Sequence, residues 1–350
     1  MKVFGAALDA LPHPEKVALK RAYLRAAAEN RLPEPDPADP YDALRPLLLE
    51  EKAFSVSDFI GKFEVDSAFT PKPAPEDFDR ISSSSHFDFL DGNGCMKIAR
   101  SLKSYVEKKV LPAMPAVMIG VDHCLSGGSI MALSESLGAA DLSVLIFDAH
   151  FDAISSGARK AAFESIFGGV TQAECPDTYS CETFVRYLLD EEWILPENLI
   201  ITGPCDYPAD EIPSVSGDGI RQYYDEYRRF ESKGITILPR DVLRESREPF
   251  KKALEGIKTK HLYVSLDLDV AASAENPAVR FHDSIGVSPG ELFDMAGQIA
   301  VRQRNGKFIL AGVDVMEMDV HLIDVRPRNG TQNRTLEIAV LFLKTLLADG

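Results

Sequence analysis

Short apolar runs alternate with longer amphipathic stretches along the 350 residues of the chain. The runs are apolar at almost every position, which is typical of strands buried on both faces. They cover 116–121, 143–147, 198–203, 234–239, 261–266 and 308–315, with a weaker candidate at 3–8. Helix-like segments lie at 181–193, 241–257, 290–304 and 331–348. This alternation predicts an α/β fold, a three-layer α/β/α sandwich with a mostly parallel central sheet.

Two segments interrupt the alternation. Residues 32–46 are rich in proline and acidic residues, and residues 69–89 contain several prolines followed by a run of serines. Such compositions are typical of loops, so both segments are predicted to form surface loops or a flap over one end of the sheet. Because the chain shows no internal repeat and no low-complexity tail, residues 1–350 are predicted to form a single domain.

The charge and the cysteines restrict the environment and the partners. The chain has 54 acidic and 38 basic residues, a formal net charge of −16, which argues against nucleic acid or an anionic membrane as a partner. Five cysteines without a CxxC spacing are typical of reduced thiols in the cytosol. The start MKVFGAALDALPHPEK does not resemble a signal peptide, and no apolar stretch is long enough to span a membrane. A cytoplasmic location is therefore expected.

Ionisable residues follow three of the predicted strands. They are Asp122 and His123 after 116–121, Asp148, His150 and Asp152 after 143–147, and Asp267 and Asp269 after 261–266. Residues two apart on an extended chain share a face, and ligands of α/β sheets bind outside the carboxyl ends of the strands. One such motif alone is more often a helix cap, a turn or a core histidine. Three of them, each directly after a buried strand, favour a common site.

The aspartates of these motifs need cations if they lie together, because unpaired carboxylates in a dry pocket repel one another and are costly to desolvate. No arginine or lysine lies within the motifs. Four aspartates would balance two divalent cations, and two neutral imidazoles would complete the ligand shells. Carboxylate and imidazole ligands without thiolates favour a cation such as Mn²⁺ over structural zinc.

The motifs GVDH (120–123), DAHFD (148–152) and SLDLDV (265–270), in this order, resemble those of the ureohydrolases: arginase, agmatinase, formimidoylglutamase and their relatives. GVDVMEMD (312–319) is similar to the family segment that carries a substrate-binding glutamate. The resemblance implies an arginase/deacetylase-like fold, a homo-oligomer and two Mn²⁺ ions per chain. One ion would bind His123, Asp148, Asp152 and Asp267, and the other would bind His150, Asp148, Asp267 and Asp269.

The resemblance also implies a reaction. A hydroxide that bridges the ions would attack the planar carbon of a small guanidino compound such as agmatine, arginine or guanidinobutyrate and release urea. Asp152 would pass a proton to the departing nitrogen, and Glu317 would bind the guanidinium group bidentately. A formimidoylglutamase-like amidine hydrolase is a close alternative. A deacetylase-type amidohydrolase and a metal-binding relative without catalysis are further alternatives.

Three positions depart from the family pattern. Val121 stands where a glycine is usual before Asp-His, and Cys181 falls where agmatinase-like chains have a proton-shuttling histidine. Cys181 is therefore a candidate proton relay if its pKa is lowered, with an ordinary buried cysteine as the alternative. The family's glycine-rich loop is replaced by residues 271–292. Arg280 in this loop is a candidate for binding a substrate carboxylate, with an exposed loop arginine as the alternative.

Overall fold

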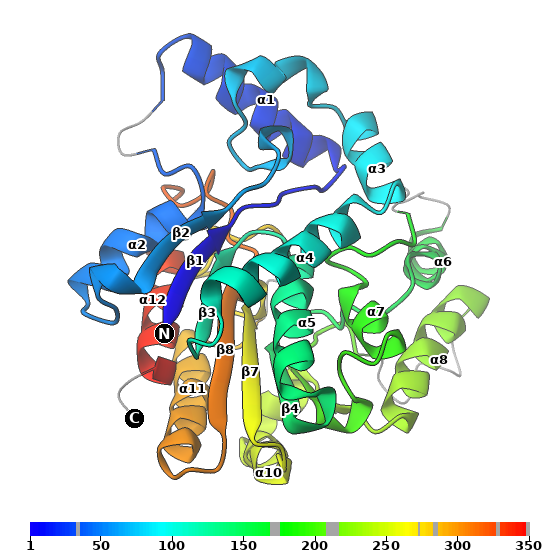
Figure 1. The fold of residues 1–350 in the computed structure, drawn as a ribbon. Coiled ribbons are helices and arrows are strands. Elements are labelled where there is room, and N and C mark those ends of the chain that lie inside the picture. The colour runs from blue at the N-terminus through cyan, green and yellow to red at the C-terminus, as the bar shows by residue number, and fades with distance from the viewer. Residues whose placement is uncertain are drawn as a thin grey trace.

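Eight parallel strands form one central sheet in the computed structural model, which describes residues 1–32, 36–168, 176–207, 217–271, 274–282, 286–326 and 330–347 (Figure 1). The strands are β1 (Lys2–Ala6), β2 (Phe59–Phe63), β3 (Ala116–Gly120), β4 (Leu142–Phe147), β5 (Leu199–Thr202), β6 (Thr236–Leu238), β7 (His261–Asp267) and β8 (Ile309–Met316). Their order across the sheet is β2-β1-β3-β8-β7-β4-β5-β6. This order places β3, β8, β7 and β4 side by side at the centre.

Helices cover both faces of the sheet, which confirms the predicted three-layer sandwich. The α-helices are α1 (Pro14–Ala28), α2 (Pro40–Glu50), α3 (Ser83–Asp91), α4 (Gly94–Tyr105), α5 (Ser126–Leu137), α6 (Ser156–Phe167), α7 (Phe184–Asp190), α8 (Asp218–Ser232), α9 (Arg240–Glu245), α10 (Glu248–Gly256), α11 (Pro289–Arg304) and α12 (Thr335–Leu347). Helices α3 to α8 contribute to the hydrophobic core on one face, and α2 with α9 to α12 contribute to the core on the other.

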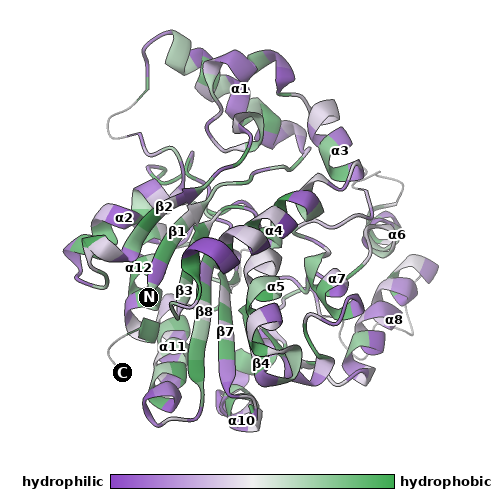
Figure 2. Cartoon of the chain, in the orientation of Figure 1, coloured by the Kyte–Doolittle hydropathy of each residue, from purple (hydrophilic) through white to green (hydrophobic). Residues whose placement is uncertain are grey.

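The residues of each central strand are shared between these two cores. In β4, Val144 and Ile146 pack into the first core, whereas Leu145 and Phe147 pack into the second. Successive side chains of a strand point to opposite faces, so a strand covered on both sides is apolar at most of its positions. Figure 2 shows hydrophobic colour over much of β8 and parts of β7, while outer helices such as α1 and α8 mix hydrophobic and hydrophilic residues.

Each apolar run predicted as a strand forms one, and β2 is a further strand outside these runs. β2 lies at the edge of the sheet, where it pairs with β1 alone, and its residues are half-buried or exposed. Its sequence FIGKF includes Lys62, whose ammonium group donates a 2.7 Å hydrogen bond to Asp39. Polar side chains are common on edge strands. The hydrophobic pattern therefore identifies the buried strands and misses this one.

Part of each predicted loop segment is helical instead. Helix α2 begins within 32–46, where the Asp39 side chain accepts a 3.0 Å hydrogen bond from the Asp42 N–H group and Pro40 occupies the first turn. An aspartate cap followed by proline is a typical helix start. Helix α3 begins within 69–89, with Ser82 as its cap. The residue types that indicated loops therefore mark helix starts here.

Helices α1 and α3 lie beyond the carboxyl ends of the strands. Figure 1 shows β1 running towards these two helices, which lie at this end of the sheet. The ammonium group of Lys16 in α1 forms a 2.9 Å ion pair with Asp319, three residues after the end of β8. This contact ties α1 to the edge of the sheet where ligands of α/β proteins bind.

Candidate metal centre

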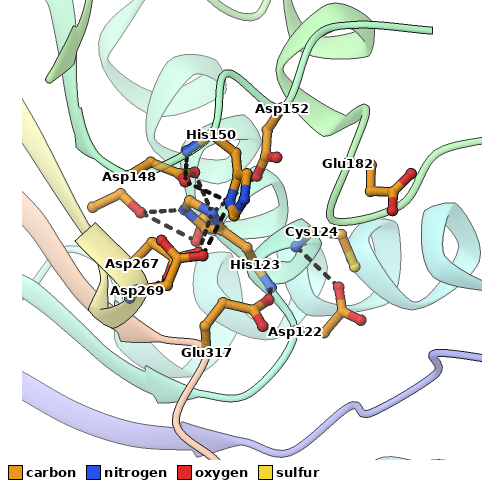
Figure 3. A network of polar contacts seen from close by, with 12 residues as sticks. Asp122, His123, Cys124, Asp148, His150, Asp152, Glu182, Asp267, Asp269 and Glu317 are labelled. Carbon is orange, nitrogen blue, oxygen red and sulfur yellow. Dashed lines mark hydrogen bonds and ion pairs between the residues drawn. The ribbon is translucent and has the colours of Figure 1, made fainter. Parts of the chain in front are cut away.

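The central strands bring the six predicted metal ligands together at one edge of the sheet. His123 follows β3, Asp148 follows β4 and Asp267 ends β7. In the sheet, β4 and β7 are neighbours, and β8 lies between β7 and β3. Figure 3 shows the six side chains converging. They are His123, Asp148, His150, Asp152, Asp267 and Asp269, and we call them the metal-ligand cluster.

One half of the cluster is arranged around His123. Its Nδ1 atom lies 3.1 Å from Asp148 Oδ2, 3.2 Å from Asp152 Oδ2 and 3.1 Å from Asp267 Oδ2. All four side chains are buried. One ring nitrogen and three carboxylate oxygens therefore face one another as the potential ligands of one ion.

The other half is arranged around His150. Its Nδ1 atom lies 3.0 Å from Asp269 Oδ2 and 3.5 Å from Asp148 Oδ1. Asp148 thus faces His123 with one oxygen and His150 with the other, as expected for a ligand shared by two ions. Backbone groups orient the carboxylates: the His150 N–H group donates to Asp148 Oδ1 at 2.6 Å, and the Ala149 N–H group donates to Asp269 Oδ1 at 3.1 Å.

A chain of hydrogen bonds orients the His123 ring. The hydroxyl groups of Tyr263 and Ser265 both donate to Asp314, the latter at 2.6 Å. Because Ser265 uses its proton in this way, its oxygen accepts the Nε2–H group of His123, at 2.9 Å. In the neutral ring Nδ1 then carries a lone pair, and it is this atom that faces the carboxylates. Metal-binding histidines typically donate their other ring N–H group to a protein acceptor in the same way.

Several atoms of the cluster lack a hydrogen bond. His123 Nδ1, Asp148 Oδ2 and Asp269 Oδ2 are buried and make none with the described residues. Within the described part of the chain, the one lysine or arginine nitrogen within 4.0 Å of a cluster carboxylate is Arg159 Nη2, at 3.9 Å from Asp152 Oδ1. Buried polar atoms normally have partners. The cluster therefore fits divalent cations, which carboxylate and imidazole groups bind.

The pKa shifts agree with a need for added positive charge. Burial opposes protonation of His123, but Asp148, Asp152 and Asp267 raise its pKa well above the usual value. Burial and the charge of Asp148 raise the pKa of Asp152 to about 7. Burial and the charges of Asp269 and Asp148 also raise the pKa of Asp267 well above its usual range. The protein's own groups thus do not keep all four carboxylates ionised.

A second group of buried charges adjoins the metal-ligand cluster. Arg280 Nη1 donates to Glu317 Oε1 at 2.9 Å and to Oε2 at 3.0 Å. Arg280 Nη2 lies 3.3 Å from Asp122 Oδ2 and 3.1 Å from Asp9 Oδ1. We call these four residues the arginine cluster. The two clusters are in contact, because Glu317 Oε1 also accepts a 2.8 Å hydrogen bond from the backbone N–H group of His123 (Figure 3).

The arginine cluster changes the interpretation of both predicted substrate-binding residues. The Arg280 side chain is 2% exposed and is bonded to protein carboxylates, so it is neither an exposed loop arginine nor positioned to meet a substrate carboxylate. Glu317 lines the cavity beside the metal-ligand cluster. His123 and Arg280 already direct three hydrogen bonds to its carboxylate, which has about four acceptor positions. Glu317 retains room for about one further donor.

Cys181 lies in the wall of the same cavity. Burial and the charges of Asp122 and Glu317 raise the pKa of its thiol well above the usual value, whereas a proton relay requires a lowered pKa. The structure therefore favours the alternative of a buried, neutral cysteine. Cys181, Asp122 and Glu317 are also close enough together to hold an ion. Arg280, however, already supplies positive charge at Asp122 and Glu317.

A cavity of about 180 Å³ opens onto the metal-ligand cluster. Its wall includes Asp152 and Asp269, and also Arg159 and Glu182, which the sequence motifs do not identify. Figure 3 shows Glu182 set apart from the six ligands. The one sequence signal for Arg159 is its position seven residues after Asp152. This position places it in the segment that follows β4 and its metal ligands. Its residue type alone is typical of any exposed helix.

The fold and the site together define the class of protein: an α/β/α sandwich with a candidate metal centre of carboxylates and imidazoles at the carboxyl edge of a parallel sheet. The sequence model of the Arginase family matches residues 76–347. The chain belongs to this family, which confirms the resemblance inferred from its motifs. Among the described residues, no helix combines the length and the apolar character needed to cross a membrane.

Solved structures of ureohydrolases share the fold. Arginase from Bacillus cereus superposes with a TM-score of 0.63 at 16% identity, covering 100% of this chain and 98% of that chain. Formimidoylglutamase from Bacillus subtilis gives 0.58 at 18% identity, with 99% and 85% coverage. A hypothetical agmatinase from Burkholderia thailandensis gives 0.55 at 17% identity, with 99% and 84% coverage. At these identities the likeness shows the fold and leaves the substrate open.

A local sequence match leads to a different kind of protein. A stretch of 123 residues of this chain is 28% identical to a protein named Probable beta-glucosidase L from Aspergillus fumigatus. The match covers 35% of this chain and only 15% of that protein. So small a share of the relative's length does not support a shared activity.

Proposed function

We propose that this protein hydrolyses a C–N bond of a small guanidino or amidine compound, using two Mn²⁺ ions held by the metal-ligand cluster. One observation carries the proposal: the buried Nδ1 atom of His123 faces three carboxylates at 3.1–3.2 Å and has no hydrogen bond. Membership of the Arginase family supports hydrolysis of a linear amidine as the reaction class. The division of Asp148 between two histidines supports two ions rather than one.

The geometry supports the ligand assignment except for Asp267 at the second ion, which follows from the family motifs alone. His123, Asp148, Asp152 and Asp267 would hold one ion, and His150, Asp148, Asp267 and Asp269 would hold the other. When bound, such a pair of cations lowers the pKa of water and polarises the bond to be cleaved. Asp152 lines the cavity as well as facing His123. We assign it to hydrogen-bond the attacking water and to pass a proton to the departing nitrogen.

Glu317 is proposed to accept an N–H group of the substrate, and its contacts favour a second candidate substrate. A guanidinium bound as a fork needs both carboxylate oxygens, whereas Oε1 is already used by His123 and Arg280. Oε2 has Arg280 Nη1 as its one hydrogen-bond donor in the described structure. An amidine presents fewer donors than a guanidinium. Formimidoylglutamase-like hydrolysis, with formamide as a product, is therefore the second candidate.

Two further alternatives make different use of the site. A deacetylase-type enzyme with a single metal needs one ligand set, so the second set around His150 argues against it. A metal-binding relative without catalysis is supported by the cysteine at the position of the family's shuttle histidine. A homo-oligomeric state and a cytoplasmic location stay predictions.

A product assay on the metal-loaded chain tests the proposal. Purified protein with added Mn²⁺ is incubated with arginine, agmatine, guanidinobutyrate, guanidine and formimidoylglutamate, and urea and formamide are measured. We expect one of these products from the wild type and from the surface control Asp241→Ala, and none from Asp148→Ala. Cleavage of an acetylated amine instead would support the deacetylase alternative. Two bound ions without any turnover would support the non-catalytic alternative.

A further inference from the structure

The wall of the cavity contains a guanidinium group outside both clusters. Among the described residues that line the cavity, Arg159 is the one with a permanent positive charge. It lies in the first turn of α6, whose cap Ser155 accepts a 3.2 Å hydrogen bond from the Ala158 N–H group. The Ser155 hydroxyl group in turn donates to Glu226 of α8 at 2.6 Å. The backbone that carries Arg159 is therefore held in place by a neighbouring helix.

The protein uses few of the hydrogen-bond donors of Arg159. Its Nη2 atom donates to the carbonyl oxygen of Glu182 at a long 3.3 Å. Its Nε atom is buried and makes no hydrogen bond with the described residues. The charges of Glu182, Asp206 and Asp152 act on Arg159. Asp206 is already bonded by two tyrosine hydroxyl groups of α8, and no hydrogen bond joins the guanidinium to a described carboxylate. Since a guanidinium has five N–H donors, Arg159 has capacity for an anion from the cavity.

The position of Arg159 also suits a second contact on a substrate held at the metal-ligand cluster. Its Nη2 atom lies 3.9 Å from Oδ1 of Asp152, a proposed metal ligand, and its side chain is 18% exposed. A cavity of about 180 Å³ accommodates a small molecule. Such a molecule can place its planar carbon group beside the metal ligands and its other end against Arg159.

We propose that Arg159 binds a carboxylate group of the substrate, so that the protein acts on guanidino or amidino acids rather than on amines such as agmatine. The inference rests on the proposed function for the other end of the molecule. Arginine and carboxylate groups form paired, charge-assisted hydrogen bonds. An amine at the same place would meet a like charge, which lowers affinity. Glu182 on the same wall is the residue that would favour an amine, and it therefore provides the matched comparison.

The test measures binding separately from turnover. Dissociation constants of the Mn²⁺-loaded full chain are determined by calorimetry for guanidinobutyrate, agmatine and butylguanidine, which share the guanidino group and differ at the other end. The variants are Arg159→Gln, Arg159→Lys and Glu182→Gln, with the exposed Arg221→Gln in α8 as a control. Metal content is measured for each, and urea release is followed in parallel.

We expect the wild type to bind guanidinobutyrate most tightly. Arg159→Gln should weaken that binding by roughly 10- to 100-fold, the usual contribution of a charged hydrogen-bonded pair. It should leave butylguanidine binding and metal content unchanged. Arg159→Lys should bind guanidinobutyrate with an affinity between those of the wild type and Arg159→Gln, because lysine keeps the positive charge and loses the paired donors of the guanidinium. The control and Glu182→Gln should bind guanidinobutyrate at least as well as the wild type.

Four results would overturn the proposal: no binding of guanidinobutyrate, tighter binding of agmatine that depends on Glu182, an equal loss for all three ligands in Arg159→Gln, or loss of metal from that variant. The last would mean that Arg159 positions Asp152 instead. Absence of urea release together with Arg159-dependent binding would remove the proposed reaction on guanidino compounds and leave the carboxylate contact of Arg159 intact. Urea release from agmatine that is unchanged in Arg159→Gln would support the proposed reaction and remove the role assigned to Arg159.

Discussion

The metal-ligand cluster and the arginine cluster are both groups of buried carboxylates at the same edge of the sheet, but their charges are balanced differently. In the arginine cluster, three carboxylates surround Arg280 at 2.9–3.3 Å. Lys20 adds a 3.4 Å ion pair to Asp9. In the metal-ligand cluster, four carboxylates face two imidazoles, and the nearest described arginine or lysine nitrogen is Arg159 Nη2 at 3.9 Å.

This difference shows how a metal site can be told from a structural charge cluster. Close acidic groups alone do not distinguish the two, since Asp122, Cys181 and Glu317 also lie within reach of a common ion. The useful distinction is whether the protein supplies its own cation. Where it does, each carboxylate lies within 3.3 Å of the Arg280 guanidinium, even though Asp9 Oδ1 makes no hydrogen bond. Where it does not, buried ligand atoms have neither a hydrogen bond nor a described lysine or arginine nitrogen within 4.0 Å, and an external cation fits.

The largest expected effect is the loss of both ions when a shared ligand is removed. Asp148→Ala and Asp267→Ala should each leave the purified chain without bound Mn²⁺, because each residue is assigned to both ions. Asp122→Ala, which removes a carboxylate of the arginine cluster, should keep both ions. Elemental analysis after dialysis measures the content. Two ions per chain in either ligand variant would refute the bridging assignment. Loss of metal from Asp122→Ala would mean that the arginine cluster also contributes to metal binding.

The next effect concerns the stability that Arg280 provides. Arg280→Met removes the guanidinium and leaves three buried carboxylates in poor balance, so the free energy of unfolding should fall by about 3–5 kcal/mol. Arg334→Met is the matched control, because Arg334 also bonds two carboxylates but at the surface, where such pairs contribute about 0–1 kcal/mol. Denaturant titration of the metal-free protein gives both values.

A double variant separates charge from packing. Adding Glu317→Gln to Arg280→Met removes one of the unpaired carboxylates and should recover part of the lost stability. If the double variant is as unstable as the sum of its single changes, the cost comes from packing, and the comparison of charge balance loses its support.

The central part of the fold and the metal ligands follow from local sequence. A strand buried on both faces is apolar at most positions, and the ligands of the metal-ligand cluster lie at or just after the ends of such strands, five of them at positions two residues apart. Both features are short-range, so the apolar runs and the DxHxD and DxD spacings reveal them without knowledge of the fold. The strand order then brings the separate motifs together.

The arginine cluster could not be predicted in this way. Asp9, Asp122, Arg280 and Glu317 are far apart in the sequence, and nothing in the neighbourhood of Arg280 indicates its partners. An arginine in a loop is exposed in most proteins, and only the assembled sheet edge shows that this one is buried. Arg159 was missed for the same reason, since its role depends on a cavity formed by several segments.

A third prediction concerns acid sensitivity beside the arginine cluster. His86 is fully buried, and its Nε2 atom lies 3.2 Å from the ammonium nitrogen of Lys20. Its Nδ1 atom lies 3.0 Å from the Ser82 carbonyl oxygen. Burial and the charge of Lys20 lower the pKa of His86 from 6.5 to about 4. Stability from the neutral ring is thus present above pH 6.5 and is lost as the pH falls towards 4.

The magnitude can be measured with a side chain that does not titrate. A shift from 6.5 to about 4 corresponds to about 3 kcal/mol. Between pH 7 and pH 4 the wild type should therefore lose up to about 3 kcal/mol more unfolding free energy than His86→Gln. Equal acid sensitivity of the two proteins would show that His86 is protonated as easily in the folded chain as in the unfolded one.

The smallest effect concerns Glu317, which belongs to the arginine cluster and also lines the cavity. Glu317→Gln keeps the shape and removes the charge, so a substrate N–H group loses a charged acceptor, and KM should rise roughly 10-fold with metal content unchanged. Asp122→Asn is the matched control, because Asp122 also pairs with Arg280 at 3.3 Å but does not line the cavity. Both variants should lose stability, and only Glu317→Gln should change KM. A wild-type KM in Glu317→Gln would remove this residue from substrate binding, whereas an equal rise in both would mean that the effect passes through Arg280.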